Sequence, residues 1–168
     1  MALEQNGMAA GDVKFSLLPF DKQVVAIQAG QVDVVGLMEP YASYLRAQGG
    51  YRVLFDAHDI FGNKQFTLHF LNRVWANAKP KEAAAFVSGV VDSIIWIEKN
   101  QAEAKKIIAK YTGVDEKFVP EYHFQENGAV IMDDVKFWLD YMKKSGDITV
   151  NWIEPEDIGT NKYNKRVH

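Results

Sequence analysis

Short apolar runs alternate with amphipathic, helix-like stretches over the first 71 residues of the chain. The apolar runs predict four short strands, over residues 13–18, 32–37, 52–55 and 65–71. Helices predicted over residues 20–29 and 41–48 separate the first three, and glycines follow both helices where a C-cap is expected. Strands separated by helices of this length favour parallel pairing through right-handed crossovers. We therefore expect an α/β fold.

From residue 72 onward the pattern is mainly helical. Pro80 at a first helical position and a broad apolar stripe reaching Ile97 predict a helix over residues 80–99. Further helical segments are predicted over residues 100–110, 115–122 and 133–143, and another is predicted to begin near Pro155, among the acids Glu154, Glu156 and Asp157. Residues 1–10 read as the end of a helix that runs into Gly7, with no strand before it.

Composition excludes several functional classes. With 48% hydrophobic and 24% charged residues, the chain has an ordinary globular mix. Its net charge of -3 provides no basic surface, so we expect no nucleic-acid partner. The absence of cysteine removes thiol nucleophiles, disulfides and iron–sulfur clusters. No apolar run approaches the length of a membrane span and no targeting segment is visible, so we expect no direct membrane insertion of this segment.

No motif for catalysis or cofactor binding is present. The glycine-rich phosphate loops and the nucleophile elbow are absent. The cluster Asp56-Ala57-His58-Asp59 could supply metal ligands, but a polar loop is the favoured interpretation because no second histidine motif completes a site. His69, inside an apolar run, is expected to be half-buried. We therefore predict no catalytic residue, no cofactor and no metal.

The segment Gly36-Leu37-Met38-Glu39-Pro40-Tyr41 is the strongest candidate for a binding site. It leaves the carboxyl end of a predicted strand, where ligands bind in open α/β sheets, and presents an acid and an aromatic ring around a stiffening proline. A purely structural interpretation is equally open. In it Pro40 is the first residue of a helix, Glu39 is an acid favoured by the helix dipole, and Tyr41 belongs to the core.

Several segments, in order, resemble the substrate-binding proteins of the nitrate, sulfonate, taurine and thiamine-precursor class of ABC importers, the NMT1/THI5-like family. They are Gln28-Ala29-Gly30-Gln31-Val32-Asp33-Val34-Val35, Glu39-Pro40-Tyr41-Ala42, Gly50-Tyr51-Arg52-Val53-Leu54, the stretch from Trp96 to Gly113, and Pro155 to Tyr163. The resemblance implies a solute-binding component that captures a small molecule, such as a sulfonate, nitrate, an amine or a pyrimidine-like compound, between two lobes. It also implies an ABC permease as partner, and a periplasmic or extracellular, lipid-anchored location.

The resemblance further implies a partial type II periplasmic-binding-protein fold. Residues 1–64 would form most of lobe two, residues 65–71 a hinge-region strand, and residues 72–168 a helical return into lobe one. The N-terminal half of the family fold would be absent. Two alternatives stay open: a pyrimidine-precursor synthase-like enzyme of the same fold, which the lack of cysteine disfavours, and a stand-alone α/β ligand-sensing domain. The preferred interpretation is that the chain is not an enzyme.

Carried over residue by residue, the resemblance places seven candidates at the ligand cleft: Pro19, Phe20, Met38, Glu39, Tyr41, Asn63 and Gln65. Glu39 would accept hydrogen bonds from a ligand amine, or else orient a neighbouring donor, while Phe20 and Tyr41 would supply apolar faces. Sulfonate or nitrate would require arginine or helix N-termini, and neither Arg46 nor Arg52 is clearly placed for that. Glu39 therefore favours an amine-bearing or heteroaromatic ligand.

Overall fold

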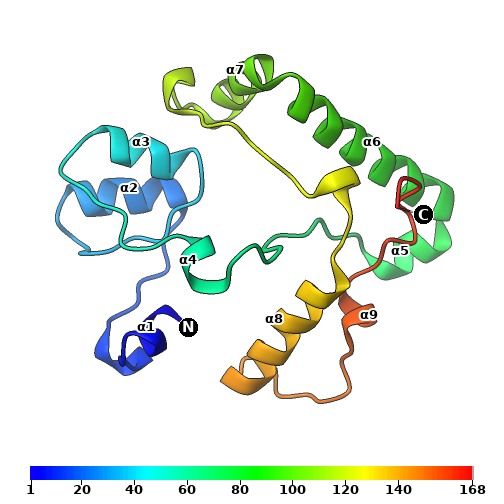
Figure 1. Ribbon diagram of the computed structural model, residues 1–168, viewed down its shortest axis with the longest axis horizontal. Coiled ribbons are helices and arrows are strands. Elements are labelled where there is room, and N and C mark those ends of the chain that lie inside the picture. The colour runs from blue at the N-terminus through cyan, green and yellow to red at the C-terminus, as the bar shows by residue number, and fades with distance from the viewer. Residues whose placement is uncertain (168) are drawn as a thin grey trace. The chain divides into compact units, whose positions relative to one another are not determined.

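The computed structural model describes residues 1–167, and every regular element in this range is a helix (Figure 1). The chain divides into two compact units: unit 1 comprises Met1–Gly62 and Gln101–Glu121, and unit 2 comprises Asn63–Asn100 and the chain from Tyr122 onward. Unit 1 contains α1 (Ala2–Gln5), η1 (Ala10–Asp12), α2 (Phe20–Gln28), α3 (Tyr41–Ala47), α4 (Ala57–Phe61), α7 (Gln101–Thr112) and η2 (Glu116–Phe118). Unit 2 contains α5 (Arg73–Ala78), α6 (Pro80–Lys99), η3 (Glu126–Gly128), α8 (Met132–Ser145) and α9 (Pro155–Ile158), where η marks a 3-10 helix.

The predicted α/β, type II periplasmic-binding-protein-like fold is wrong for the described residues, because residues 1–167 contain no β-strand. The four apolar runs, over residues 13–18, 32–37, 52–55 and 65–71, are irregular instead. A strand exists only where a neighbour accepts its backbone hydrogen bonds. Within the part of the chain that the structure describes, no backbone-to-backbone hydrogen bond joins one run to another. None of their apolar side chains is fully buried, and Leu17 is 102% exposed.

Most helix predictions are confirmed. Helix α6 has the predicted bounds, and α2, α3 and α8 begin and end within two residues of expectation. The predicted helix over residues 115–122 is reduced to the single turn η2. Two α-helices of the described residues are not predicted by the sequence. Helix α4 replaces the expected polar loop, because Asp56 and Asp59 each accept a hydrogen bond from the other's backbone N–H. Helix α5 follows Asn72, whose side chain accepts a hydrogen bond from Trp75 N.

Unit 1 packs its helices around a small set of aliphatic and aromatic side chains. Helix α2 contacts α3, and both α3 and α7 contact η2. Leu45 of α3 and Ala104 of α7 are buried. The rings of Tyr44 and Phe118 meet edge to face, with centroids 5.4 Å apart, which fixes η2 against α3. The hydrophobic core of unit 1 therefore lies among these helices, and the three apolar runs of this unit, over residues 13–18, 32–37 and 52–55, contribute no buried residue to it.

Unit 2 is built on α6, which contacts α5 and η3, and on α8, which contacts α9. Ala83 and Val91 of α6 and Leu139 of α8 are buried. Gly128 of η3 has a φ of +61°, and a Cβ there would lie 3.1 Å from Cγ2 of Val91. Only glycine satisfies both the left-handed backbone and this close approach, so Gly128 lets η3 lie directly on α6.

Two side-chain amides form hydrogen bonds to the extended segment 129–131 of unit 2, and each amide bonds to different peptide groups of that segment. Gln65 donates from Nε2 to the carbonyl of Ala129 (2.9 Å) and accepts at Oε1 from the N–H of Ile131 (3.0 Å). Asn161 accepts at Oδ1 from the N–H of Val130 (2.8 Å) and donates to its carbonyl (2.9 Å). Alternate peptide groups of an extended segment point to opposite sides, so the two amides act where neighbouring strands would. We call this arrangement the amide clamp.

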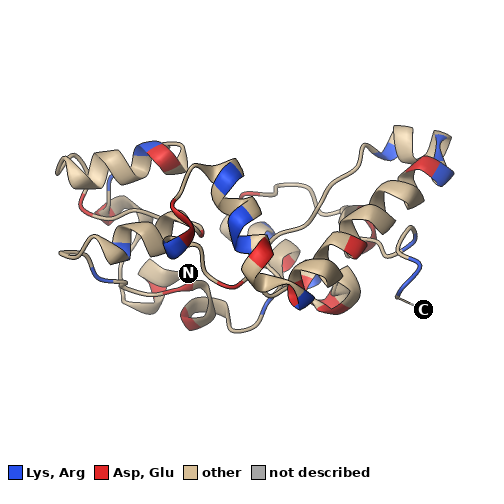
Figure 2. Ribbon diagram, turned by 90° about the horizontal axis from the view of Figure 1, so that it is seen from above, with Lys and Arg blue, Asp and Glu red and all other residues tan. Residues whose placement is uncertain are grey.

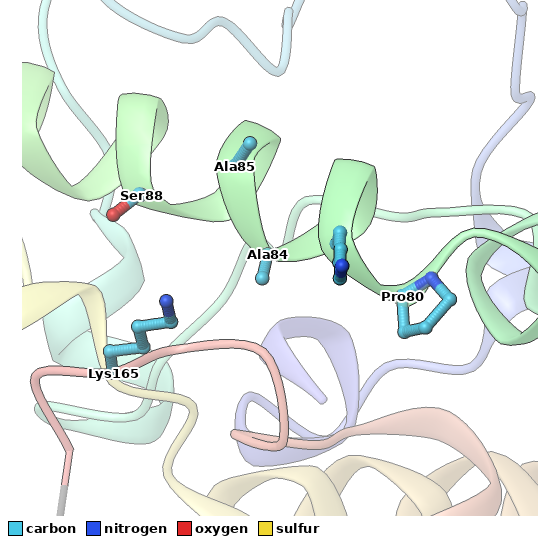
Figure 3. A pocket seen from close by; sticks show the side chains of 6 residues that line it. Pro80, Ala84, Ala85, Ser88 and Lys165 are labelled. Carbon is cyan, nitrogen blue, oxygen red and sulfur yellow. The ribbon is translucent and has the colours of Figure 1, made fainter.

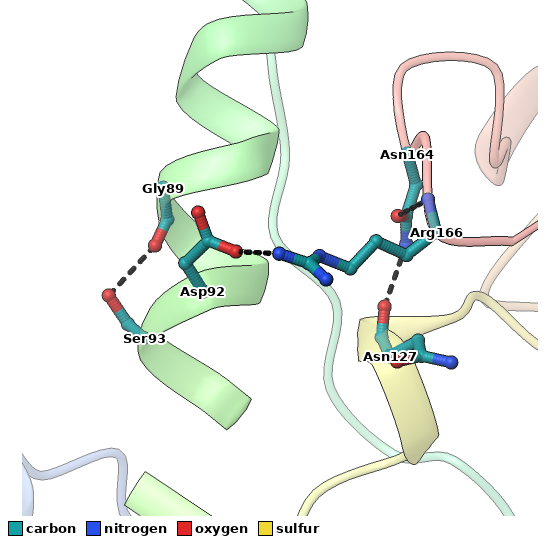
Figure 4. A network of polar contacts seen from close by, with 6 residues as sticks. All are labelled: Gly89, Asp92, Ser93, Asn127, Asn164 and Arg166. Carbon is teal, nitrogen blue, oxygen red and sulfur yellow. Dashed lines mark hydrogen bonds and ion pairs between the residues drawn. The ribbon is translucent and has the colours of Figure 1, made fainter. Parts of the chain in front are cut away.

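The end of the described chain is tied to η3 and α6 by polar contacts (Figure 4). Asn164, which is buried, donates from Nδ2 to the carbonyl of Asn127 at 2.9 Å. Arg166 forms an ion pair with Asp92 of α6, with 2.6 Å between Nη2 and Oδ1. These contacts join segments that are more than 30 residues apart in the sequence.

Candidate functional site

Unit 1 contains five of the seven predicted site residues, at the starts of two helices that pack on each other. Pro19 is the N-cap of α2 and Phe20 its first residue, while Tyr41 is the first residue of α3. The rings of Phe20 and Tyr41 are stacked, with centroids 6.5 Å apart and planes 28° from parallel. Residues separated by a helix and an apolar run are thus brought into contact.

Met38, Glu39 and Pro40 lead into α3. The carbonyl of Met38 accepts hydrogen bonds from the N–H groups of Tyr41 (3.1 Å) and Ala42 (3.3 Å), which fixes the start of the helix. The Glu39–Pro40 peptide bond is cis. Pro40 is buried and is the N-cap, not the first helical residue, while the Met38 side chain is 43% exposed. The segment therefore presents Met38 to solvent beside a fixed helix N-terminus.

The carboxylate of Glu39 is occupied within the chain. Its Oε2 accepts a hydrogen bond from the N–H of Ser43 at 3.0 Å, and its Oε1 lies 3.4 Å from Nη2 of Arg46. The first contact satisfies a donor in the first turn of α3 that has no partner within the helix. The second holds the guanidinium group of Arg46 on the side of α3 that carries Ser43. Of the two roles foreseen for Glu39, its geometry matches the orientation of a neighbouring donor.

Arg46 lies at this site although the sequence alone did not indicate a position for it there. Its side chain is 58% exposed, so guanidinium N–H groups that do not face Glu39 are open to solvent. A signal was present in the sequence, since seven residues separate Glu39 from Arg46 and two helical turns bring such positions to one face. The chemistry on offer at the start of α2 and α3 is therefore two aromatic rings, a thioether and an oriented cation.

Asn63 and Gln65 belong to unit 2. Asn63 is exposed. Gln65 is half-buried, and besides the two side-chain bonds of the amide clamp its N–H donates to Oδ2 of Asp134 (2.8 Å) and its carbonyl accepts from Nε1 of Trp138 (2.8 Å). Every one of these partners lies in unit 2, and in this conformation Gln65 braces the segment before α8.

The histidines make no metal site in the described range. Within residues 1–167 no group of three or more acidic, histidine or cysteine side chains is arranged to hold a metal ion. His69, expected to be half-buried, is exposed because its run has no neighbouring strand to cover it. His123 meets the carboxylate of Glu98 at 3.1 Å, and the N–H of Phe124 donates to the same carboxylate at 2.8 Å. The Phe124 hydrogen bond first, and His123 second, lower the pKa of Glu98.

A surface cavity of about 340 Å³ lies in unit 2 beside the first turns of α6 (Figure 3). It is lined by Pro80, Lys81, Ala84, Ala85, Ser88 and Lys165, and none of the predicted site residues is among them. Acidic and basic residues are interspersed along the helices (Figure 2). Of the helices in residues 1–167, none is both long and apolar enough to span a bilayer.

Residues 1–113 match the NMT1-like family. A putative aliphatic sulfonates-binding protein of Escherichia coli (strain K12) is 28% identical over 127 residues, which cover 72% of this chain and 37% of that protein. The chain thus spans little more than a third of the length of this relative. No solved structure matches the chain.

Proposed function

The chain belongs to the NMT1-like family, and from that premise we propose that it is a solute-binding component of an ABC-type import system. In this role it captures a small molecule and presents it to a membrane permease, in the periplasm or at the outer cell surface under a lipid anchor. The observation that carries the proposal is the similarity to a protein named as a putative aliphatic sulfonates-binding protein. The role is binding, with no catalytic step.

We propose an aliphatic sulfonate as the ligand, in place of the amine that Glu39 suggested from the sequence. Each oxygen of the Glu39 carboxylate already accepts one hydrogen bond, from Ser43 N or from Arg46, and the charge of Arg46 offsets the attraction of the carboxylate for a ligand amine. Arg46 retains outward N–H donors in the fork that suits an oxyanion. In this proposal Arg46 binds the sulfonate group, and Glu39 is a positioning residue.

The alkyl part of the ligand would contact the stacked pair Phe20 and Tyr41, together with Met38 and Pro19. The Phe20 side chain is 40% exposed and that of Met38 43%, so both have apolar surface available for a ligand. An aliphatic chain that covers this surface is stabilised by about 25 cal/mol for each Å² of apolar area removed from water. Longer sulfonates should therefore bind more tightly than methanesulfonate.

We also propose how the residue ranges of the chain correspond to the parts of the family's binding protein. Residues 1–64 would belong to the second lobe of the family's binding protein, residues 65–71 to the hinge region, and residues 72–168 to the return into the first lobe. Asn63 and Gln65 would then lie where the lobes meet. The match covers 37% of the relative, which fits a chain that corresponds to part of such a protein.

Titration followed by NMR chemical shifts tests the proposal on the 168-residue chain. We expect 1-butanesulfonate to shift resonances of Phe20, Tyr41 and Arg46, with butylamine producing no such change. Arg46→Gln should weaken binding about tenfold or more, as the loss of one charge-assisted contact implies. Arg52→Gln is the matched control, because Arg52 lies in an apolar run outside α2 and α3. Equal losses in both variants, or no shift with any sulfonate, would overturn the proposal.

A further inference from the structure

The surface cavity of unit 2 is lined by one face of α6 and by the end of the described chain (Figure 3). Lys81, Ala84, Ala85 and Ser88 have the spacing i, i+3, i+4, i+7, so they share a face of the helix. The two short alanine side chains leave open space between a cation at one end and a hydroxyl at the other. The volume of about 340 Å³ lies at the lower end of the range of about 300–1,000 Å³ that is typical of small-molecule sites.

Lys165 lines the same cavity, and polar contacts hold the backbone on both sides of it (Figure 4). Asn164 is buried and donates from Nδ2 to the carbonyl of Asn127 at 2.9 Å. Arg166 donates from its N–H to Oδ1 of Asn164 (3.1 Å) and forms the ion pair with Asp92. The Lys165 side chain therefore begins at a fixed point of the backbone and points toward α6 (Figure 3). Binding would order this side chain without ordering the segment that carries it.

The charges at the cavity are positive and unpaired. Within residues 1–167, the side chains of Lys81, Lys165 and Ser88 form no ion pair or hydrogen bond. Glu82, the acid in the first turn of α6, is not a lining residue, and Asp92 is already paired as described above. The positive end of the helix dipole lies at the same turn. The lining thus carries two cations and no acid, which favours an anion as the occupant.

We propose that this cavity binds a phosphate monoester, as a small free compound or as the headgroup of a lipid. A phosphate monoester carries a charge of about −1.5 to −2 at neutral pH, which Lys81 and Lys165 together balance. Each ammonium group offers three donors to the phosphate oxygens, and the hydroxyl of Ser88 offers one more. The short organic part would contact Ala84 and Ala85. This site shares no residue with the one proposed at α2 and α3, and it does not depend on that proposal.

Titration of the 168-residue chain with sn-glycerol 3-phosphate, followed by NMR chemical shifts, tests the proposal. We expect shifts at Lys81, Ala84, Ser88 and Lys165, and none with glycerol, which has the same body without the charge. Methanesulfonate carries one negative charge and should bind at this cavity at least about threefold more weakly. Equal affinity for both anions would overturn the assignment of a dianion.

Charge removal tests the two lysines. Lys81→Gln and Lys165→Gln should each raise the Kd for glycerol 3-phosphate about fivefold to tenfold, because each removes one charge-assisted contact. Lys99→Gln is the matched control, since it removes the same charge from the last turn of α6, about 27 Å along the helix axis from Lys81. At that distance the charge is screened, so the Kd should change by less than about twofold. Equal losses in Lys81→Gln and Lys99→Gln would overturn the proposal.

Filling the cavity tests its location without a change of charge. Ala84→Leu adds bulk between the two lysines and should weaken binding about tenfold or more, with Lys81 and Lys165 both retained. Ala102→Leu, at an exposed position of α7 in unit 1, is the control and should bind as the unmodified chain does. Circular dichroism identifies any variant that fails to fold. Unchanged binding by a folded Ala84→Leu would show that the phosphate lies elsewhere.

Cosedimentation with phosphatidylcholine vesicles, with and without phosphatidic acid, distinguishes the two sources of the phosphate. Binding to glycerol 3-phosphate that exceeds binding to the vesicles identifies a free compound. Binding only to vesicles that contain phosphatidic acid, lost in Lys81→Gln and kept in Lys99→Gln, identifies a lipid headgroup. Binding to neither probe would overturn the proposal.

Discussion

Glu39 and Arg46 are joined along one face of α3, with 3.4 Å between Oε1 and Nη2. The same carboxylate accepts from the N–H of Ser43 in the first turn. A single side chain therefore both caps the helix and orients a cation near its other end. Substitutions of Glu39 can distinguish the capping contact with Ser43 from the ion pair with Arg46.

Replacing Glu39 tests the capping role. Glu39→Ala removes both contacts, and we expect the free energy of unfolding to fall by about 1 kcal/mol, as for the loss of a helix cap. Glu39→Gln keeps an acceptor for Ser43 N and loses only the ion pair, which is worth about 0–1 kcal/mol because Arg46 is largely exposed. Urea denaturation at neutral pH measures both. Equal destabilisation by the two variants would assign the whole effect to charge and contradict a capping role.

Acid should weaken the contact between Glu98 and the segment at His123 and Phe124. The folded pKa of Glu98 lies below its ordinary value of 4.5, so its contribution to stability is present above that value and is lost as pH falls through the folded pKa. We expect the urea midpoint of the chain to decline in this acidic window by more than that of Glu98→Gln. Glu103→Gln, an exposed carboxylate on α7, is the control and should decline as the unmodified chain does. Parallel pH profiles for the chain and Glu98→Gln would refute the expectation.

Removing the Gln65 side chain should cost more than an ordinary polar substitution. Gln65→Ala leaves the half-buried Ala129 carbonyl and Ile131 N–H without partners, and each unsatisfied group costs about 1–3 kcal/mol. We expect a loss of roughly 2 kcal/mol or more in unfolding free energy, measured by urea denaturation. Gln48→Ala, at an exposed position after α3, should change it by less than about 0.5 kcal/mol. Similar losses at both positions would mean that the clamp contributes nothing.

Gly128→Ala should separate backbone strain from steric conflict. Gly128 and Gly146 both have positive φ, +61° and +84°, but a Cβ at Gly146 meets nothing within 4 Å whereas one at Gly128 approaches Val91. The conformation alone costs about 1–2 kcal/mol, and overpacking adds about 1–3 kcal/mol. Thermal unfolding should show Gly128→Ala to be the less stable variant. Equal melting temperatures would show that η3 moves away from α6 at no cost.

The helices could be predicted from the sequence because their signals are local. Pro80 and the apolar stripe of α6 specify a helix without reference to any other segment, and the bounds agree. A strand depends on a second segment, and the run at residues 65–71 has strand composition, but its residues 67–71 make no backbone hydrogen bond within the described part of the chain. The α4 cap has a signal that two interpretations share: Asp56 and Asp59 suit a metal site by residue type, and their spacing of three is also that of a capping box.

The candidate site was only partly accessible to sequence reasoning. Phe20 and Tyr41 were each singled out, but their ring contact depends on the packing of α2 on α3, which periodicity alone does not give. Arg46 could have been found by extending α3 two turns from Glu39. The hydrogen bonds of Gln65 to Ala129 and Ile131 join residues more than 60 positions apart, and no local sequence pattern predicts them.

The amide clamp has a consequence for solvent exchange. The N–H groups of Val130 and Ile131 donate to the side chains of Asn161 and Gln65. Their protons therefore exchange with solvent only when these hydrogen bonds open. These two amides should exchange with deuterium slowly although they lie outside every helix. The exchange rates of these two protons would then report how often the side-chain hydrogen bonds of Gln65 and Asn161 open, and not the unfolding of any helix.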